Sequence, residues 1–196
     1  MNSTQIISVI NQKGGVGKTT TVINLATALS FMKKKVLVID LDPQGNATTG
    51  FGLSTSESTK TIYEVLHGNC KIEEAIQDTK IQNLKIIPSN VELSGLEVET
   101  ANETRRAFLL QDKIRDFIND KKNDFSYILI DCPPSLNLLT ITALVAAKSL
   151  IVPLQAEFFA LEGLSQLMKT IDRVKIKLNP NLHIRGVLLT MFDKRN

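Results

Sequence analysis

Short runs of apolar residues alternate with longer stretches of helical pattern along this chain. The apolar runs lack strict alternation with polar residues, and they occupy residues 6–10, 36–39, 84–87, 127–130, 150–152 and 184–189. Such runs are typical of parallel strands that are buried on both faces. The helical patterns occupy residues 18–32, 102–121, 137–147 and 159–178. This alternation predicts an α/β fold with a doubly wound, mostly parallel sheet and helices on both faces.

Two segments depart from that alternation. Residues 45–61 are rich in Gly, Ser and Thr and have no clear period, which predicts a mobile loop after a strand end. The last predicted strand is followed only by residues 190–196. We therefore expect residues 1–196 to form a single domain that lacks its C-terminal strand and helices.

Composition narrows the classes of function. The net charge of +3 is mildly basic, which permits a weak nucleic-acid surface without arguing for one. Cys70 and Cys132 belong to no CxxC or Cys/His cluster, so we expect two reduced thiols. The N-terminus has no signal-peptide pattern, and no stretch approaches the roughly 20 apolar residues of a membrane span. These features predict a soluble, cytoplasmic protein without a membrane partner.

The strongest chemical signal lies between the first predicted strand and the first predicted helix. Its glycines allow a tight turn in which backbone N–H groups point at phosphate oxygens, and the helix that follows adds its positive dipole end. Lys18 is expected to reach the β- and γ-phosphates, and the Thr19 hydroxyl to ligate Mg²⁺. The segment therefore predicts binding of ATP with Mg²⁺. The expected phosphate contacts are Lys13, Gly14, Gly15, Val16, Gly17, Lys18, Thr19 and Thr20.

This phosphate loop differs from the usual pattern G-x-x-x-x-G-K-[ST] at one position. Gln12 stands where that pattern has its first glycine, and Lys13 lies beside it. Lys13 either points into solvent or supplies a second cation to a phosphate. The spacing alone leaves both interpretations open.

Three acidic residues follow predicted strands. Asp40 and Asp42 come at the end of the second strand, and Asp131 at the end of the fourth. Ligands bind at the carboxyl ends of strands in such sheets, so all three are expected to face the triphosphate. Asp131 fits a carboxylate on the Mg²⁺ side, acting directly or through water, and Asp42 is a candidate to orient the attacking water. The alternative is that each Asp merely ends its strand as a turn residue.

At these residues the sequence resembles the deviant Walker A class of P-loop ATPases, and within it the ParA/Soj chromosome- or plasmid-partitioning family. The shared segments are residues 13–20, in which Lys13 is the deviant lysine, together with residues 40–48 and 131–135. Residues 159–164 and 186–191 look like later segments of the family. Relatives that position division sites carry a similar loop without the Pro43-Gln44-Gly45-Asn46-Ala47-Thr48 continuation.

The resemblance implies roles for the residues of the site. Lys13 would cross to the nucleotide of a partner subunit in an ATP-bound sandwich homodimer, so that Lys13, Lys18 and Asp42 form the catalytic set. Asp40 and Asp131 would join Thr19 around Mg²⁺. Hydrolysis would be slow and stimulated by a centromere-binding ParB/Spo0J-like partner. The ATP dimer would bind nucleoid DNA without sequence preference and be released on hydrolysis, which implies a nucleoid-associated protein.

Non-specific DNA binding needs several cations on one face, each neutralising a phosphate. Arg195 lies where the family places a DNA-contacting arginine, and Lys194 and Arg173 are further candidates. Each could equally be a solvated surface charge. The basic residues of the late chain are Lys169, Arg173, Lys175, Lys177, Arg185, Lys194 and Arg195.

Two other functions compete with DNA partitioning. A membrane-cycling ATPase that positions the division site would call for a C-terminal amphipathic helix, and the sequence at residues 193–196 carries no such pattern. A nucleotide-binding interaction module with little catalysis is the other alternative. Intact Lys18, Thr19, Asp42 and Asp131 argue against that second reading.

Overall fold

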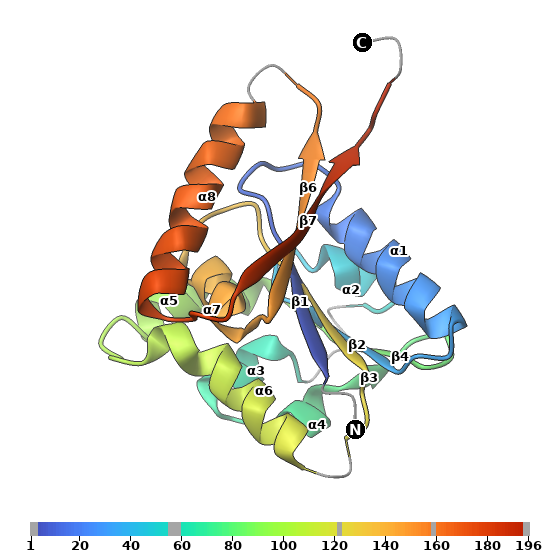
Figure 1. Ribbon diagram of the computed structural model, residues 1–196. Helices are drawn as coiled ribbons and strands as arrows, with labels where there is room; N and C mark the ends of the chain where they lie inside the picture. Colours follow the sequence, from blue (N-terminus) through green and yellow to red (C-terminus); the bar gives the residue numbers. More distant parts are fainter. Residues whose placement is uncertain (1–3, 55–59, 121–122, 158–159, 194–196) are drawn as a thin grey trace.

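The computed structural model describes residues 4–54, 60–120, 123–157 and 160–193 (Figure 1). Its centre is a seven-stranded sheet in the order β3-β4-β2-β5-β1-β6-β7. All neighbouring strands pair in parallel except β3 and β4, which are antiparallel. The mostly parallel α/β sheet predicted from the sequence is therefore confirmed. The strands are β1 Gln5–Val9, β2 Val36–Asp40, β3 Gln77–Asp78, β4 Leu84–Ile87, β5 Tyr127–Asp131, β6 Ser149–Gln155 and β7 His183–Thr190.

Helices cover both faces of the sheet. One face is covered by α1 (Lys18–Phe31) and α2 (Asn46–Gly50), whose Val22, Ala26 and Ala47 pack on alternate residues of β1, β2 and β4. The opposite face carries α3, α4, α6, α7 and α8 over the remaining strand residues. These helices are α3 Ile62–His67, α4 Ile72–Ala75, α6 Leu109–Asn119, α7 Leu138–Ala146 and α8 Ala160–Lys177, with the shorter α5 Leu96–Glu99, η1 Val91–Gly95 and η2 Arg106–Phe108 beside them.

The predicted strands and helices mostly recur, with some shifts in their ends. Strand β6 is longer than predicted, and β3 was missed because two residues carry no periodic signal. The helix predicted over residues 102–121 is wrong at its start, where turns and η2 precede α6. Lys121 and Phe159, at the ends of two predicted helices, lie outside the described residues.

The loop predicted for residues 45–61 is wrong in its first part. Residues 46–50 form α2, and Ala47 and Thr48 of that helix are buried. The next helix, α3, begins with a capping box in which Thr61 and Glu64 satisfy each other's backbone N–H groups. The Thr61-x-x-Glu64 spacing is typical of a helix start and could have predicted α3 from the sequence.

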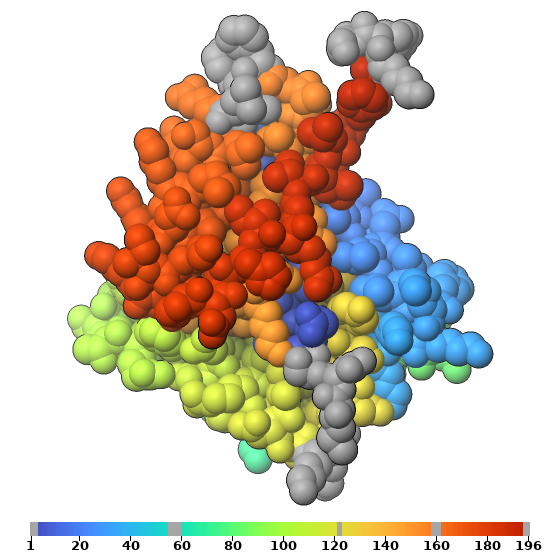
Figure 2. All heavy atoms as spheres, viewed as in Figure 1, coloured from blue at the N-terminus to red at the C-terminus, as the bar shows by residue number. Residues whose placement is uncertain are grey.

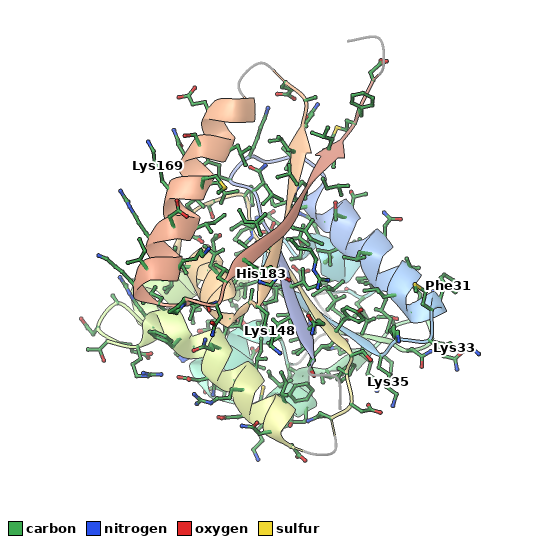
Figure 3. The ribbon with its side chains drawn as sticks, in the orientation of Figure 1. Phe31, Lys33, Lys35, Lys148, Lys169 and His183 are labelled. Carbon is green, nitrogen blue, oxygen red and sulfur yellow. The ribbon has the colours of Figure 1, made fainter. Side chains whose placement is uncertain are left out.

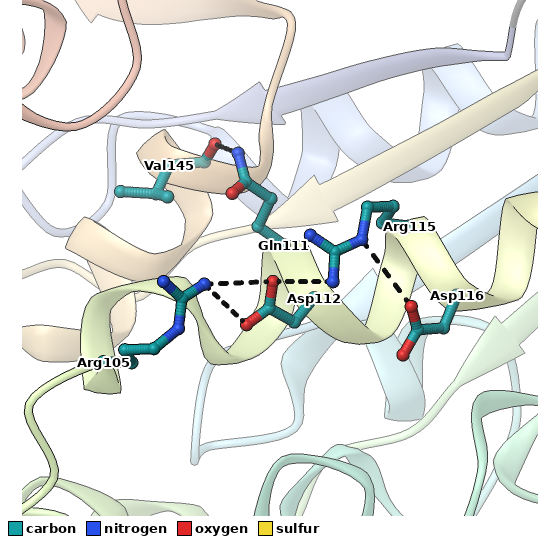
Figure 4. A network of polar contacts seen from close by, with 6 residues as sticks. All are labelled: Arg105, Gln111, Asp112, Arg115, Asp116 and Val145. Atoms are coloured by element: carbon teal, nitrogen blue, oxygen red, sulfur yellow. Dashed lines mark hydrogen bonds and ion pairs between the residues drawn. The ribbon is translucent and has the colours of Figure 1, made fainter.

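Helix α6 is tied to its surroundings by a polar network at its first turns (Figure 4). Asp112 lies 3.1 Å from the guanidinium groups of both Arg105 and Arg115. Gln111 donates a hydrogen bond of 2.9 Å to the Val145 carbonyl near the end of α7. Exposed ion pairs of this kind contribute little stability, so the Gln111 contact and the buried face of α6 fix the helix.

The strand β7 lies at the edge of the sheet and crosses the surface of the molecule (Figure 2). Apolar side chains on both of its faces are exposed, including Val187, Leu188 and Leu189. In the part of the chain that the structure describes, no helix is long and apolar enough to cross a membrane.

Candidate nucleotide-binding site

The loop between β1 and α1 has the backbone that the glycine spacing predicts. Gly15 and Gly17 have φ angles of 74° and 87°, a region that side-chain-bearing residues rarely adopt. Gly17 is the N-cap of α1, and it leaves the first N–H groups of the helix without a side-chain cap. The first turn of α1 also contains no acidic residue. These free N–H groups and the helix dipole make the loop a site for an anion.

A cavity of about 320 Å³ lies over this loop. Its floor is formed by most of the predicted phosphate contacts, namely Gly14, Gly15, Gly17, Lys18, Thr19 and Thr20. Asp42 and Asn46 line it from the end of β2 and the start of α2. Pro134 and Met191 line it from the segments after β5 and β7. Of these further residues, only Asp42 was singled out from the sequence, because Asn46, Pro134 and Met191 carry no charge to mark them.

Two of the predicted contacts, Val16 and Lys13, lie outside that lining. Val16 is buried beneath the loop, where its carbonyl accepts a 2.9 Å hydrogen bond from Thr190 at the end of β7.

Lys18 is buried, and its ammonium donates a 2.9 Å hydrogen bond to the Lys13 carbonyl. Burial lowers the pKa of Lys18, while the nearby Asp131 opposes that shift. A phosphate that displaces the Lys13 carbonyl would meet an ammonium already oriented toward the loop.

Asp131 is fully buried at the end of β5, behind the loop. Neither of its carboxylate oxygens has a hydrogen-bond partner of good geometry within the described residues. Burial and the neighbouring Asp40 raise the pKa of Asp131 to about 7, and Thr19 and Lys18 partly offset that shift. A buried carboxylate without donors next to a Thr hydroxyl fits a hard divalent cation or its bound water. The side chains of Asp131 and Thr19 are therefore suited to hold Mg²⁺.

Asp40 pairs in register with Asp131 on the neighbouring strand, yet its environment differs. One oxygen accepts hydrogen bonds from the backbone N–H of Thr48 at 2.8 Å and from its hydroxyl at 2.7 Å. The other oxygen lies 3.2 Å from the N–H of Asp42. Burial raises the pKa of Asp40 to about 6 despite these donors. Asp40 thus holds α2 and the turn at Asp42 in place, and its contact with a metal stays a prediction.

Asp42 is the acid that lines the cavity. It is nearly buried, and its Oδ1 accepts a 3.0 Å hydrogen bond from the backbone N–H of Gln44. That bond fixes one carboxylate oxygen in the turn that leads to α2. The structure therefore brings Asp42 to the phosphate loop and places Asp131 and Asp40 behind it.

Lys13 lies on the outer side of the loop. Its side chain is absent from the cavity lining and forms an ion pair with Glu157, just beyond the end of β6. Its backbone N–H donates a 3.0 Å hydrogen bond to the side chain of Asn11, which in turn donates one of 2.7 Å to the Pro153 carbonyl. The sequence left open whether the Lys13 side chain points into solvent or to a phosphate. In the structure this side chain is about half exposed and pairs with Glu157.

The basic residues predicted to bind DNA are only partly described. Arg173 is exposed on α8, and Lys169 on the same helix points away from the protein (Figure 3). Lys194 and Arg195 lie outside the described residues. Cys132, beside Asp131, is buried, and burial raises its pKa, which keeps the thiol protonated and unreactive.

Comparison with known proteins identifies the family of the chain. Residues 4–184 match the family model described as an AAA domain. The chain is 49% identical over 195 residues to the chromosome partitioning protein ParA of Caulobacter vibrioides, covering all of this chain and 72% of that protein. It is 44% identical over 191 residues to the sporulation initiation inhibitor protein Soj of Bacillus subtilis, covering 97% of this chain and 74% of that protein.

A solved structure has the same fold. The chain superposes with a TM-score of 0.92 on the cobyrinic acid a,c-diamide synthase of Mycobacterium smegmatis, solved with an ATP analogue and magnesium. The two are 38% identical, over 98% of this chain and 75% of that one. Identity is higher to the partitioning proteins than to this synthase. The chain belongs to the ParA/Soj family of chromosome-partitioning P-loop ATPases.

Proposed function

We propose that this protein is a DNA-partitioning ATPase whose ATP-bound form is a homodimer that binds DNA. The observation that carries the proposal is the different placement of the two lysines of the loop. Lys18 is oriented within its own cavity, whereas Lys13 lies outside that cavity. A site that keeps a second loop lysine outside its own phosphate cavity has a cation available for another subunit.

ATP is the substrate, and its phosphates would occupy the cavity above the loop. The N–H groups at Gly14, Gly15 and Gly17 and at the start of α1 would bind phosphate oxygens. The Lys18 ammonium would exchange its bond to the Lys13 carbonyl for the β- and γ-phosphates. Because Lys18 is buried and already oriented, little further ordering is needed when the phosphates arrive.

Thr19 and Asp131 are the residues that would hold Mg²⁺, Thr19 by its hydroxyl and Asp131 directly or through water. Bound Mg²⁺ neutralises charge on the phosphate oxygens as the terminal phosphoryl group leaves. Asp40 supports this region from behind through its bonds to Thr48. The negative charge of Asp40 also raises the pKa of Asp131. Two carboxylates this close repel each other, and a cation beside them relieves that repulsion.

Asp42 would orient the attacking water. Its Oδ1 is held by Gln44, and the carboxylate lines the cavity in which the γ-phosphate would lie. A fixed carboxylate can accept a hydrogen bond from water and aim its lone pair at phosphorus. The reaction transfers the γ-phosphoryl group to water and yields ADP and inorganic phosphate.

The cycle would couple ATP to DNA. Lys13 would contact the nucleotide of the second subunit, in a role comparable to an arginine finger. Dimerisation would double the basic surface around Arg173 and the late chain and so permit salt-sensitive, non-specific DNA binding. A ParB/Spo0J-like partner would stimulate hydrolysis, and release from DNA would follow. The protein would then be associated with the nucleoid.

The test measures ATP turnover and DNA retention together. Turnover by the purified chain is expected to be slow and to rise when DNA and a cognate ParB-like protein are both added. Gel shift of non-specific DNA should need ATP, and anionic liposomes should not sediment the protein. Lys18→Ala should abolish turnover, which excludes a contaminating activity. Binding to liposomes without binding to DNA would overturn this function.

A further inference from the structure

Glu157 is a charged residue next to the site to which the proposed reaction gives no role. It follows strand β6, and its carboxylate pairs with the Lys13 ammonium. The two side chains are 38% and 48% exposed, respectively. No other ion pair of Lys13 occurs within the described residues.

The same side of the loop has further contacts with the β6–α8 region. The amide of Gln12 donates hydrogen bonds to the Gly163 carbonyl at 3.1 Å and to the Gln166 side chain at 3.2 Å. A Cβ at Gly163 would lie 3.3 Å from that amide, so the packing there is close. The backbone that carries Lys13 is therefore fixed against α8, and the direction of the Lys13 side chain depends on what its ammonium meets.

Two anionic groups compete for that ammonium within one subunit. One is a phosphate in the cavity formed by the loop itself, and the other is Glu157. Lys18 already serves the cavity from inside, so a second lysine turned inward would add a contact in the same subunit and be lost to any partner. The ion pair with Glu157 keeps Lys13 on the outer side.

We propose that Glu157 is a positioning residue that holds Lys13 out of its own phosphate cavity and so keeps it available to the nucleotide of a second subunit. This inference rests on the proposed function, in which Lys13 acts across a dimer. Because the pair is half exposed, it exchanges readily, and a phosphate of higher charge on the partner can take the ammonium from Glu157. The effect is therefore modest and sensitive to salt.

The experiment compares Glu157→Gln with Glu162→Gln by sedimentation velocity, using a slowly hydrolysed ATP analogue. Glu162 is an exposed acid at the start of α8, and within the described residues Lys13 pairs with Glu157 and not with Glu162. Its substitution makes the same change in charge without touching the ion pair. Glu157→Gln should raise the analogue concentration at half-dimerisation by two- to fivefold. Glu162→Gln should match the wild type, and Glu157→Asp should restore part of the loss. The difference should disappear in 0.5 M salt, because the Debye length falls from about 8 Å at 0.15 M salt to about 4 Å at 0.5 M.

A second measurement follows the accessibility of the Lys13 amine, which the ion pair should reduce. Amine acetylation followed by mass spectrometry should label Lys13 two- to fivefold faster in Glu157→Gln than in the wild type, with Lys169 as the internal reference. Equal labelling of Lys13, or dimerisation by Glu157→Gln at the wild-type concentration or below it, would overturn the inference.

Lys13→Ala separates this inference from the function on which it rests. If Lys13→Ala fails to dimerise while Glu157→Gln behaves as the wild type, only the role of Glu157 is overturned. If Lys13→Ala dimerises normally, the proposed function fails at the cross-subunit contact, and the role of Glu157 fails with it.

Discussion

The Asp40 carboxylate accepts two hydrogen bonds from Thr48, one from its backbone N–H at 2.8 Å and one from its hydroxyl at 2.7 Å. The same hydroxyl accepts a 3.0 Å bond from the N–H of Ser89, beyond β4. A buried threonine thus joins the end of β2, helix α2 and the segment after β4. The turn that carries Asp42 into the cavity depends on this junction.

Thr48→Val removes the hydroxyl and keeps the shape of the side chain. It leaves the Ser89 N–H without that acceptor and takes one donor from Asp40, so the free energy of unfolding should fall by about 2–3 kcal/mol. Thr49→Val, on the exposed side of α2, should change it by less than about 0.5 kcal/mol. Urea unfolding of both variants measures the difference. Equal stability of the two would show that the junction does not hold α2.

Asp131→Asn tests the buried carboxylate in the absence of Mg²⁺. The pKa of Asp131 is raised to about 7, so its contribution to stability is present below the ordinary value of 3.8 and is lost as the pH rises through about 7. In EDTA the variant should therefore gain stability over the wild type as the pH rises from 5 to 8, by on the order of 2 kcal/mol. Thermal unfolding at the two pH values provides the measurement. A gain independent of pH would show that ionisation of Asp131 does not destabilise the protein.

The same variant should behave in the opposite way with ligand. Mg²⁺ and an ATP analogue should raise the melting temperature of the wild type more than that of Asp131→Asn, because a neutral amide is a poorer partner for the cation. Analogue added with EDTA should remove most of the difference. If the cation stabilised both proteins equally, Asp131 would have no part in holding it.

Asp42→Asn keeps an oxygen that can accept the Gln44 N–H and removes the negative charge. We expect ATP turnover to fall at least about 100-fold, while the affinity for the ATP analogue stays within a few fold. Asp116→Asn, at an exposed acid on α6, serves as the control. Turnover is measured as phosphate release. Wild-type turnover in Asp42→Asn would remove Asp42 from the reaction.

The sheet and the phosphate loop were predictable because their signals are local. A buried parallel strand requires a continuous apolar run, and a tight anion loop requires Gly15 and Gly17 at positions of positive φ. The two-residue β3 and the early part of α2 could not be found in this way. Helix α2 follows Gly45 without a side-chain cap, and it is stabilised by the carboxylate of Asp40, which accepts the N–H of Thr48 inside the helix from a position that matches no capping pattern.

For the site, the sequence predicted which residues take part but not what each of them contacts. Asp40, Asp42 and Asp131 all lie at or just after a strand end in the sequence. In the structure only Asp42 of the three lines the cavity, and only Asp131 has buried oxygens without hydrogen-bond partners among the described residues. The partner of Lys13 could not be predicted either, because Glu157 is 144 residues away in the chain. Long-range pairing of β1 with β6 brings the two together.

In the proposed dimer, the cavity over the phosphate loop is half of a site shared between two subunits. Sedimentation velocity of Lys13→Ala with a slowly hydrolysed ATP analogue tests it most directly, with Lys34→Ala as the control at an exposed lysine. We expect wild type and Lys34→Ala to form dimers, and Lys13→Ala to remain monomeric while binding ADP with wild-type affinity. Dimers of Lys13→Ala at the wild-type concentration of analogue would contradict this expectation.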